Sequence, residues 1–247
     1  METLGYIGDV LLTIEKKRVA QAVRISHLQK NSKRDKDGEE ILEKLEDFEE
    51  WITEKMATKV KNHPAYWWFS CVKGVGQENI GKILAFIDIK RATHISSLWK
   101  WFGYSPNQKR RKGEKLDFNI KGKSMCWRLA GNLLKAKGKF YDYYLSEKEK
   151  FELRCINEGK IIKEQKDIKK KDINVISRGH IHNYALRKMI KRFLACLWLV
   201  WREAEGLPIT KPYAIDKLGH NHFVKPRTMM DKVRAAKQTK RRRRATW

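Results

Sequence analysis

A Gly74-Val75-Gly76 turn joins two apolar stretches of the chain, with Lys73 before it and Lys82 after it. Glycine lets the backbone approach a phosphate closely, and the N–H groups at the start of the following helix can bind that phosphate. The segment resembles a helix-hairpin-helix. We therefore expect Lys73, Gly74, Gly76 and Lys82 to contact phosphate. The alternative is a plain helix–helix turn that uses glycine for its geometry.

A second segment places aromatic residues beside a basic loop, between Leu98 and Gly113. Aromatic rings can stack on bases while neighbouring cations hold phosphates, so we expect Trp99 and Tyr104 to stack on bases. Phe102 is expected in the core. The alternative is that Trp99 is also a core residue and that the loop is solvated. The expected RNA contacts of this segment are Lys100, Gln108, Lys109, Arg110, Arg111 and Lys112.

Two later helical segments also carry basic residues. A helix predicted to run to Ala136 has Lys121, Lys123 and Arg128 near its start, where the helix dipole favours phosphate. A second basic face follows Gly179. The expected RNA contacts on that face are Arg187, Lys188, Lys191 and Arg192. The alternative is a solvated helix face, but the net charge of the chain favours RNA.

Two His-x-His pairs occur, at residues 180–182 and 220–222. Such pairs can converge on zinc, with Cys196 as a further ligand. The alternative, which we favour, is that they hydrogen-bond neighbouring loops or contact RNA, and we expect His180 and His182 to do so. We predict no metal and no cofactor. The letters HNH at 220–222 do not indicate the nuclease of that name, which needs a ββα-metal fold and a wider spacing.

The charge balance narrows the class of partner. The chain of 247 residues has 55 Lys+Arg against 29 Asp+Glu, a formal net charge of +26, which opposes compaction unless a polyanion neutralises it. The apolar run from Phe193 to Trp201 is far shorter than the roughly 20 residues of a membrane span. The start of the chain lacks the apolar region of a signal peptide, and the four scattered cysteines are typical of reduced thiols. We expect a cytoplasmic nucleic-acid-binding protein with no membrane partner.

Helical periodicity positions these segments. Residues 1–61 predict a helical hairpin with an apolar stripe in each helix, and its turn is expected between Asn31 and Gly38. The stripe of the second helix is Ile41, Leu45, Phe48, Ile52, Met56 and Val60. No convincing strand-like alternation occurs, so the predicted fold class is all-α. The predicted domains are the hairpin (1–61, a coiled coil that can dimerise), an RNA-binding helical domain (62–224) and a basic tail (225–247). The tail ends in Arg241, Arg242, Arg243 and Arg244, which bind nucleic acid through charge.

A resemblance joins several of these elements. The strings GVGQENIGKILAFI, SLWKWFGYSP, a basic Gly-containing loop, IKGKSMCWRLAGNLLKA and FYDYY occur in this order over about residues 68 to 145, roughly a third of the chain. This order resembles the C-terminal domain of the bridge-RNA-guided insertion-sequence transposases. It is also similar to the Nop domain of archaeal box C/D guide-RNA particles, which follows a coiled coil as residues 1–61 would here. The combination resembles the Tas proteins of tandem-interspaced-guide-RNA (TIGR) systems.

The resemblance implies a ribonucleoprotein that holds a small guide RNA, recognises target DNA by base pairing and forms a homodimer. Two departures from the transposases argue against an enzyme. The first 61 residues are helical and cannot build a ribonuclease H-like sheet, and the loop serine before a glycine is replaced near Arg111, with Lys112 preceding Gly113. We therefore expect no nuclease of its own. The alternatives are a transposase-related enzyme using Asp142 with Glu147 or Asp216 with the histidines, and a generic duplex-DNA-binding protein.

Overall fold

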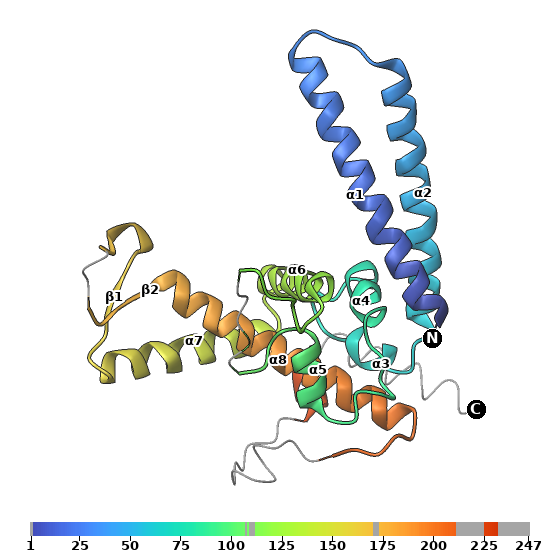
Figure 1. Ribbon diagram of the computed structural model, residues 1–247. Coiled ribbons are helices and arrows are strands. Elements are labelled where there is room, and N and C mark those ends of the chain that lie inside the picture. The colour runs from blue at the N-terminus through green and yellow to red at the C-terminus, as the bar shows by residue number, and fades with distance from the viewer. Residues whose placement is uncertain (1, 107, 109–111, 170–172, 211–224, 232–247) are drawn as a thin grey trace. The chain divides into compact units, whose positions relative to one another are not determined.

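The computed structural model describes residues 2–106, 108, 112–169, 173–210 and 225–231 (Figure 1). It divides into two compact units: residues 1–66 with 76–87, and residues 67–75 with 88–247. The predicted domain boundary near residue 62 differs from this division, because residues 76–87 group with the hairpin. The chain passes from the second unit to the first within the Gly74–Gly76 turn, between residues 75 and 76.

The first unit is a helical hairpin with a short third helix (Figure 1). Helix α1 spans Glu2–Lys30, α2 spans Lys36–Lys61 and α4 spans Gln77–Leu84. Asp35 begins α2, because its carboxylate accepts a hydrogen bond from the N–H of Gly38 at 3.0 Å. The core residues are Leu4, Ile7, Leu11, Ile25, Ile52, Met56, Val60, Ile80 and Ile83. The predicted hairpin over residues 1–61 is confirmed.

The stripe predicted for α2 is partly wrong. Ile52, Met56 and Val60 are buried, but Ile41 and Phe48 are 54% and 40% exposed. Gly38 is a buried residue of α2 instead of the end of the turn. In the first half of α2, the buried side of the helix is therefore rotated relative to the predicted stripe. This rotation leaves Ile41 and Phe48 on an outward face.

The second unit is built around α8, which spans Arg178–Ala204 and lies alongside α7, Lys139–Asn157 (Figure 1). The other helices are α3 (Tyr66–Phe69, beginning at the unit boundary), α5 (Ile95–Trp101), α6 (Ile120–Ala136) and two 3-10 turns, η1 (Gln165–Asp167) and η2 (Pro226–Met229). Three rings form the centre of the core, because Phe193 lies 5.4 Å from Trp68 and 5.5 Å from Phe140 between ring centroids. These contacts bury the inward side of α8.

One small sheet was not predicted. Strands β1 (Ile161–Lys163) and β2 (Val175–Ser177) pair in parallel, with Ile161 opposite Val175. Three residues are too few for alternation to show in the sequence. The predicted all-α class is nevertheless confirmed, since helices dominate the described residues. Of the helices in the described part, none combines the length and apolar character needed to cross a membrane.

The segment before the basic tail is packed into the second unit. The indole N–H of Trp68 donates to the carbonyl of Pro226 at 2.8 Å, and Met229 is buried. The buried carboxylate of Asp231 accepts hydrogen bonds from the backbone N–H groups of Lys73 at 2.6 Å and Lys139 at 3.3 Å. Residues 225–231 therefore belong to the folded unit, whereas the tail was predicted to start at residue 225. Arg241–Arg244 lie outside the described residues.

Candidate nucleic-acid interface

Helix α8 carries the basic face that its sequence predicts. The Ser177 hydroxyl accepts a hydrogen bond from the N–H of His180 at 3.1 Å and caps the start of the helix. Leu186, Met189, Ile190 and Phe193 are buried, whereas the first of the four positions between them is exposed and the other three are half-buried. Those positions are occupied by Arg187, Lys188, Lys191 and Arg192. Residues one turn apart on a helix are neighbours, so these four charges share one face.

Helix α6 adds Lys123 to the same region. The Lys123 ammonium donates to the carbonyl of Gly103 at 3.0 Å and lies 4.4 Å from the ring centroid of Phe118. Burial lowers the pKa of Lys123, and the charge of Arg187 lowers it further. The two helices therefore bring Lys123 and Arg187 close enough for their charges to repel. We call Lys123, Arg187, Lys188, Lys191 and Arg192 the cationic cluster.

Lys191 shows the same crowding of charge. Its ammonium lies 4.1 Å from the ring centroid of Trp99, and its backbone carbonyl accepts from the Trp99 indole N–H at 3.1 Å. Burial lowers the pKa of Lys191, and Lys188 lowers it further. A nearby anion would raise both lysine pKa values again, because it favours the charged form.

The cluster carries an excess of positive charge. The Arg192 guanidinium lies 5.1 Å from the ring centroid of Tyr143. Lys188 is 3.9 Å from a carboxylate oxygen of Glu147, which also pairs with Lys150 at 3.6 Å. Among the described residues, this shared carboxylate is the one ion-pair partner of the cluster, and it does not balance five cations. Such an arrangement attracts a polyanion and gains from the counterions that a nucleic acid releases.

The glycine turn has a different role from the one expected. Gly74 has a φ of +86°, and a Cβ at this position would lie 2.7 Å from the carbonyl oxygen of Asn132 in α6. The glycine therefore permits close packing on α6, and its predicted phosphate contact is not supported. The N–H of Lys73 is bound to Asp231, while the Lys73 side chain is exposed. Gly76 is exposed and has open space around its Cα, so it remains compatible with a phosphate contact.

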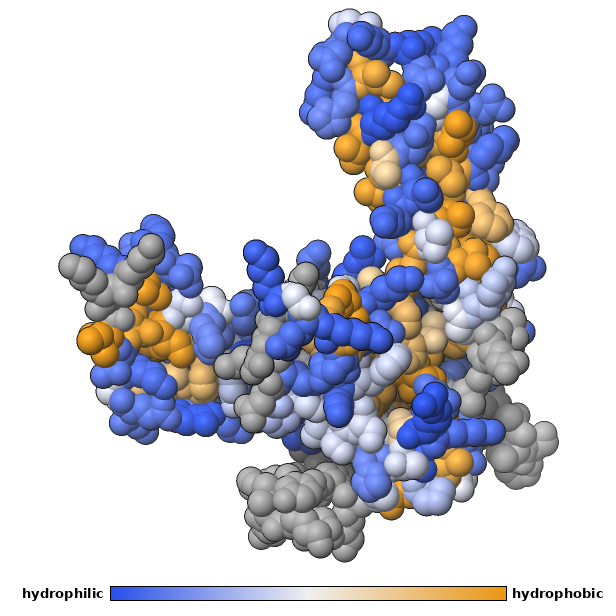
Figure 2. All heavy atoms as spheres, in the orientation of Figure 1, coloured by the Kyte–Doolittle hydropathy of each residue, from blue (hydrophilic) through white to orange (hydrophobic). Residues whose placement is uncertain are grey.

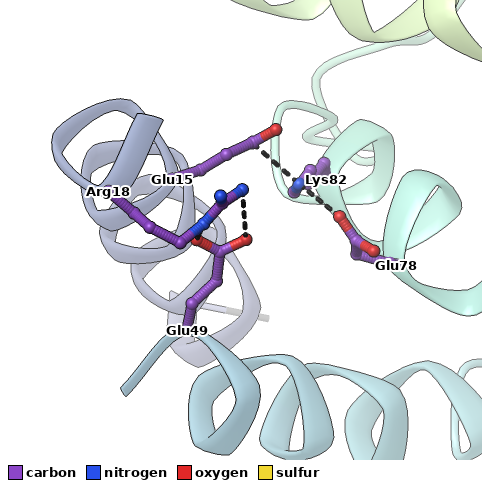
Figure 3. Close-up of polar contacts among 5 residues, drawn as sticks. All are labelled: Glu15, Arg18, Glu49, Glu78 and Lys82. Atoms are coloured by element: carbon purple, nitrogen blue, oxygen red, sulfur yellow. Dashed lines mark hydrogen bonds and ion pairs between the residues drawn. The ribbon is translucent and has the colours of Figure 1, made fainter. Parts of the chain in front are cut away.

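Lys82 is not placed to bind phosphate (Figure 3). Its side chain is 1% exposed, and the ammonium lies 2.9 Å from a carboxylate oxygen of Glu15 and 2.6 Å from one of Glu78. A phosphate could reach this ammonium only by displacing two carboxylates from a closed site. The prediction for Lys82 is therefore wrong in this structure, because the sequence does not show which lysine is buried.

The predicted stacking residues are also covered. Tyr104 is 6% exposed, and burial raises its pKa, so the expected stacking on bases is not supported. Trp99 is half-buried and has Lys191 over its ring. Phe102 is buried, as expected. Two other indoles of the second unit are more exposed: Trp101 is 47% exposed and Trp127 is 44% exposed.

The sequence contained a signal for Trp127. The buried residues of α6 are Met125, Cys126, Leu129, Ala130 and Leu133, which form a helical stripe. Trp127 is out of phase with that stripe and therefore points outward. Trp127 lies outside the segment beside the basic loop, so nearness to that loop does not identify it.

The loop after Pro106 is only partly described. The Gln108 amide donates to the carbonyl of Lys100 and to Asp117, both at 3.1 Å, so it holds the loop together and is not free for RNA. Lys100 and Lys112 are exposed, as are Lys121 and Arg128 on α6. Lys109, Arg110 and Arg111 lie outside the described residues.

The first histidine pair faces aromatic residues. His182 Nδ1 lies 2.6 Å from the hydroxyl of Tyr144, and burial together with the charge of Lys148 lowers the His182 pKa. This bond leaves His182 with only one ring nitrogen for any RNA contact. His180 is exposed and stacks near Phe151 at 6.2 Å between centroids. Within the described ranges, no group of three His, Cys, Asp or Glu could hold a metal ion. His220 and His222 lie outside these ranges.

Comparisons with protein-family models, with curated proteins and with solved structures found no match to this chain. The chemistry of the cationic cluster therefore carries the functional proposal.

Proposed function

We propose that this protein binds RNA through the cationic cluster. The single observation that carries the proposal is the convergence of five cations from α6 and α8, two of which have pKa values lowered by burial and, further, by a neighbouring cation. Holding like charges together costs free energy that a bound phosphate backbone recovers. A folded protein with a net charge of +26 gains most from a polyanionic partner.

We propose further that the RNA is a small guide RNA and that the ribonucleoprotein recognises target DNA by base pairing. This part depends on the order of sequence elements that resembles the Nop-like and TIGR Tas proteins. In such a particle the protein reads the shape and backbone of the RNA, and pairing supplies the sequence specificity. The protein would have no nuclease activity of its own.

The contacts of the glycine turn and of two carboxylates bear on the alternatives. A duplex-DNA-binding protein of the helix-hairpin-helix kind would present its glycine turn to phosphate, but Gly74 packs on Asn132 and the N–H of Lys73 is bound to Asp231. For the enzyme alternative, Asp142 pairs with Lys139 at 3.7 Å and Glu147 with Lys150 and Lys188. Asp216 lies outside the described residues. The packing of Gly74 and the bound N–H of Lys73 thus argue against the duplex-DNA alternative.

We also propose that the hairpin mediates homodimerisation. Figure 2 shows hydrophobic residues exposed along it. Ile41 and Phe48 lie on the outward face of α2, where Phe48 stacks on Trp51 at 5.6 Å between centroids. Acidic residues outnumber basic ones in α2, so this face does not suit a nucleic acid. We therefore expect the exposed apolar side chains of α2 to pack against the same side chains of a second copy and not against a nucleic acid.

The test of RNA binding is a salt titration. Affinity for a structured RNA is measured across salt concentrations for the wild type, for the double variant Arg187→Ala with Lys188→Ala, and for the control Lys59→Ala with Lys61→Ala on α2. Each lost phosphate contact lowers the slope of log K against log salt by about 0.7 to 0.9. We expect a slope lower by about 1.4 to 1.8 for the α8 variant and an unchanged slope for the control. Equal slopes for both variants would refute the cluster as the interface.

The test of the guide role is the RNA itself. We expect a discrete small RNA to co-purify at high salt from cells that express the protein with its neighbouring genes. A smear of cellular RNA would reduce the proposal to general RNA binding. Cleavage of RNA or DNA that depends on Mg²⁺ and disappears in Asp216→Ala would instead support the enzyme alternative.

A further inference from the structure

Trp127 is an indole that α6 holds away from the core. The Asn119 side chain accepts a hydrogen bond from the N–H of Gly122 at 2.8 Å and begins the helix. From there the apolar stripe from Met125 to Leu133 is buried, which fixes the rotation of the helix. Trp127 is therefore directed outward and is 44% exposed.

The surroundings leave the faces of this indole open. Besides Lys123, whose ammonium is bound to the carbonyl of Gly103, and the buried Ala130, its neighbours along the same side of α6 are Ser124 and Gly131, which are one turn before and one turn after it. Both are small, and a Cβ added at Gly131 would meet no atom within 4 Å. In the part of the chain that the structure describes, Trp127 takes part in no ring stack and no cation–π contact.

The charge around Trp127 selects the kind of partner. Helix α6 contains no Asp or Glu, and Lys121 and Arg128 are exposed on it. Trp51 is a useful contrast, because it is 50% exposed but stacks on Phe48 and lies 5.4 Å from Lys55 on an acidic helix. An exposed indole on a helix that also carries exposed cations can bind a base by stacking while the cations hold the adjoining phosphates. A second copy of the chain would present the same cations, and these would repel one another.

We infer that Trp127 is a stacking platform for an unpaired RNA base, with Lys121 and Arg128 binding the neighbouring phosphates. The inference rests on the proposed RNA binding and adds the class of RNA element that α6 recognises. It selects unpaired nucleotides because the faces of paired bases are covered by their neighbours within a duplex. Loops, bulges or single-stranded ends of the RNA would therefore bind here.

The experiment compares two probes and four proteins. The probes are a single-stranded oligouridylate of about twelve nucleotides and a blunt-ended RNA duplex of about the same length, in keeping with usual single-strand site sizes. The proteins are the wild type, Trp127→Ala, Trp127→Phe and the control Leu153→Ala, which removes an apolar side chain that is 54% exposed on α7. Unfolding of each variant is measured in parallel.

We expect Trp127→Ala to weaken single-strand binding about 5- to 100-fold, the usual effect of removing one base stack. Duplex binding and the salt slope should not change, because no charge is removed. Trp127→Phe should restore most of the affinity, and Leu153→Ala should bind like the wild type. An equal loss on both probes, or no loss on either while the wild type binds RNA, would overturn the inference. If the wild type binds neither probe at low salt, RNA binding itself is refuted.

Discussion

Lys82 offers the sharpest test, because its sequence context suggests a phosphate ligand and its structure shows a buried ion pair. The perturbation is Lys82→Met, which keeps the length and most of the volume of the side chain and removes its charge. The ammonium of Lys82 is 1% exposed, whereas Glu15 and Glu78 are 18% and 48% exposed at their side chains (Figure 3). The substitution leaves Glu15 without its cation in a mostly enclosed site.

The size of the effect follows from these exposures. Removing one partner of a fully buried ion pair costs about 3 to 5 kcal/mol. Water screens Glu78, so we expect a lower free energy of unfolding by about 2 to 4 kcal/mol for Lys82→Met. Glu78→Gln should cost under about 1 kcal/mol, since that carboxylate is half exposed. The exposed Lys59→Met should change the stability little.

The assay is urea unfolding of the three variants, followed by the salt titration of RNA binding. We expect Lys82→Met to lower the unfolding midpoint while leaving the salt slope of RNA binding unchanged. A variant that unfolds like the wild type but has a lower salt slope would refute the ion pair. It would also restore Lys82 as a phosphate contact.

Two further predictions concern the first unit. His63 is buried, its Nδ1 accepts from the N–H of Ala65 at 3.1 Å, and burial lowers its pKa from 6.5 to about 4. The pKa of His63 is lower in the folded state than in the unfolded state, so the neutral ring contributes stability above pH 6.5. This stability, about 3 kcal/mol in full, is lost as the pH falls toward 4. When the free energy of unfolding is measured from pH 7 to 4, we expect a shallower decline for His63→Asn than for the wild type, and parallel declines would contradict this. Phe48→Ser should weaken homodimerisation at least about tenfold in sedimentation equilibrium, because it removes an apolar side chain from the outward face of α2. A dimer of unchanged strength would place the interface elsewhere.

The cationic cluster was only partly foreseeable. Arg187, Lys188, Lys191 and Arg192 could be placed on one face because their spacing in a helix puts them there. Lys123 belongs to a helix more than fifty positions away in the sequence, and no local pattern shows that it approaches Arg187. Burial lowers the pKa of Lys123 and the charge of Arg187 lowers it further, and both effects exist only once α6 and α8 are packed.

The aromatic residues show the same limit. Tyr104 and Trp99 lie beside basic residues in the sequence, yet Tyr104 is buried and Trp99 has Lys191 over its ring. Trp127 could have been found, because it breaks the apolar phase of its own helix. Strands β1 and β2 could not, because a parallel pair of three residues each depends on a partner segment that is distant in sequence.

The sequence by itself determined the helical class, the hairpin of residues 1–61, the long helix α8 and the large positive net charge. These follow from periodicity and net charge, which are local or additive properties of the residues. The tertiary structure alone decided which lysines remain open to a phosphate: Lys82 is enclosed by Glu15 and Glu78, while Lys191 lies over Trp99 beside Lys188. Burial and charge–charge contact depend on which elements pack together, and neighbours along the chain do not specify that packing.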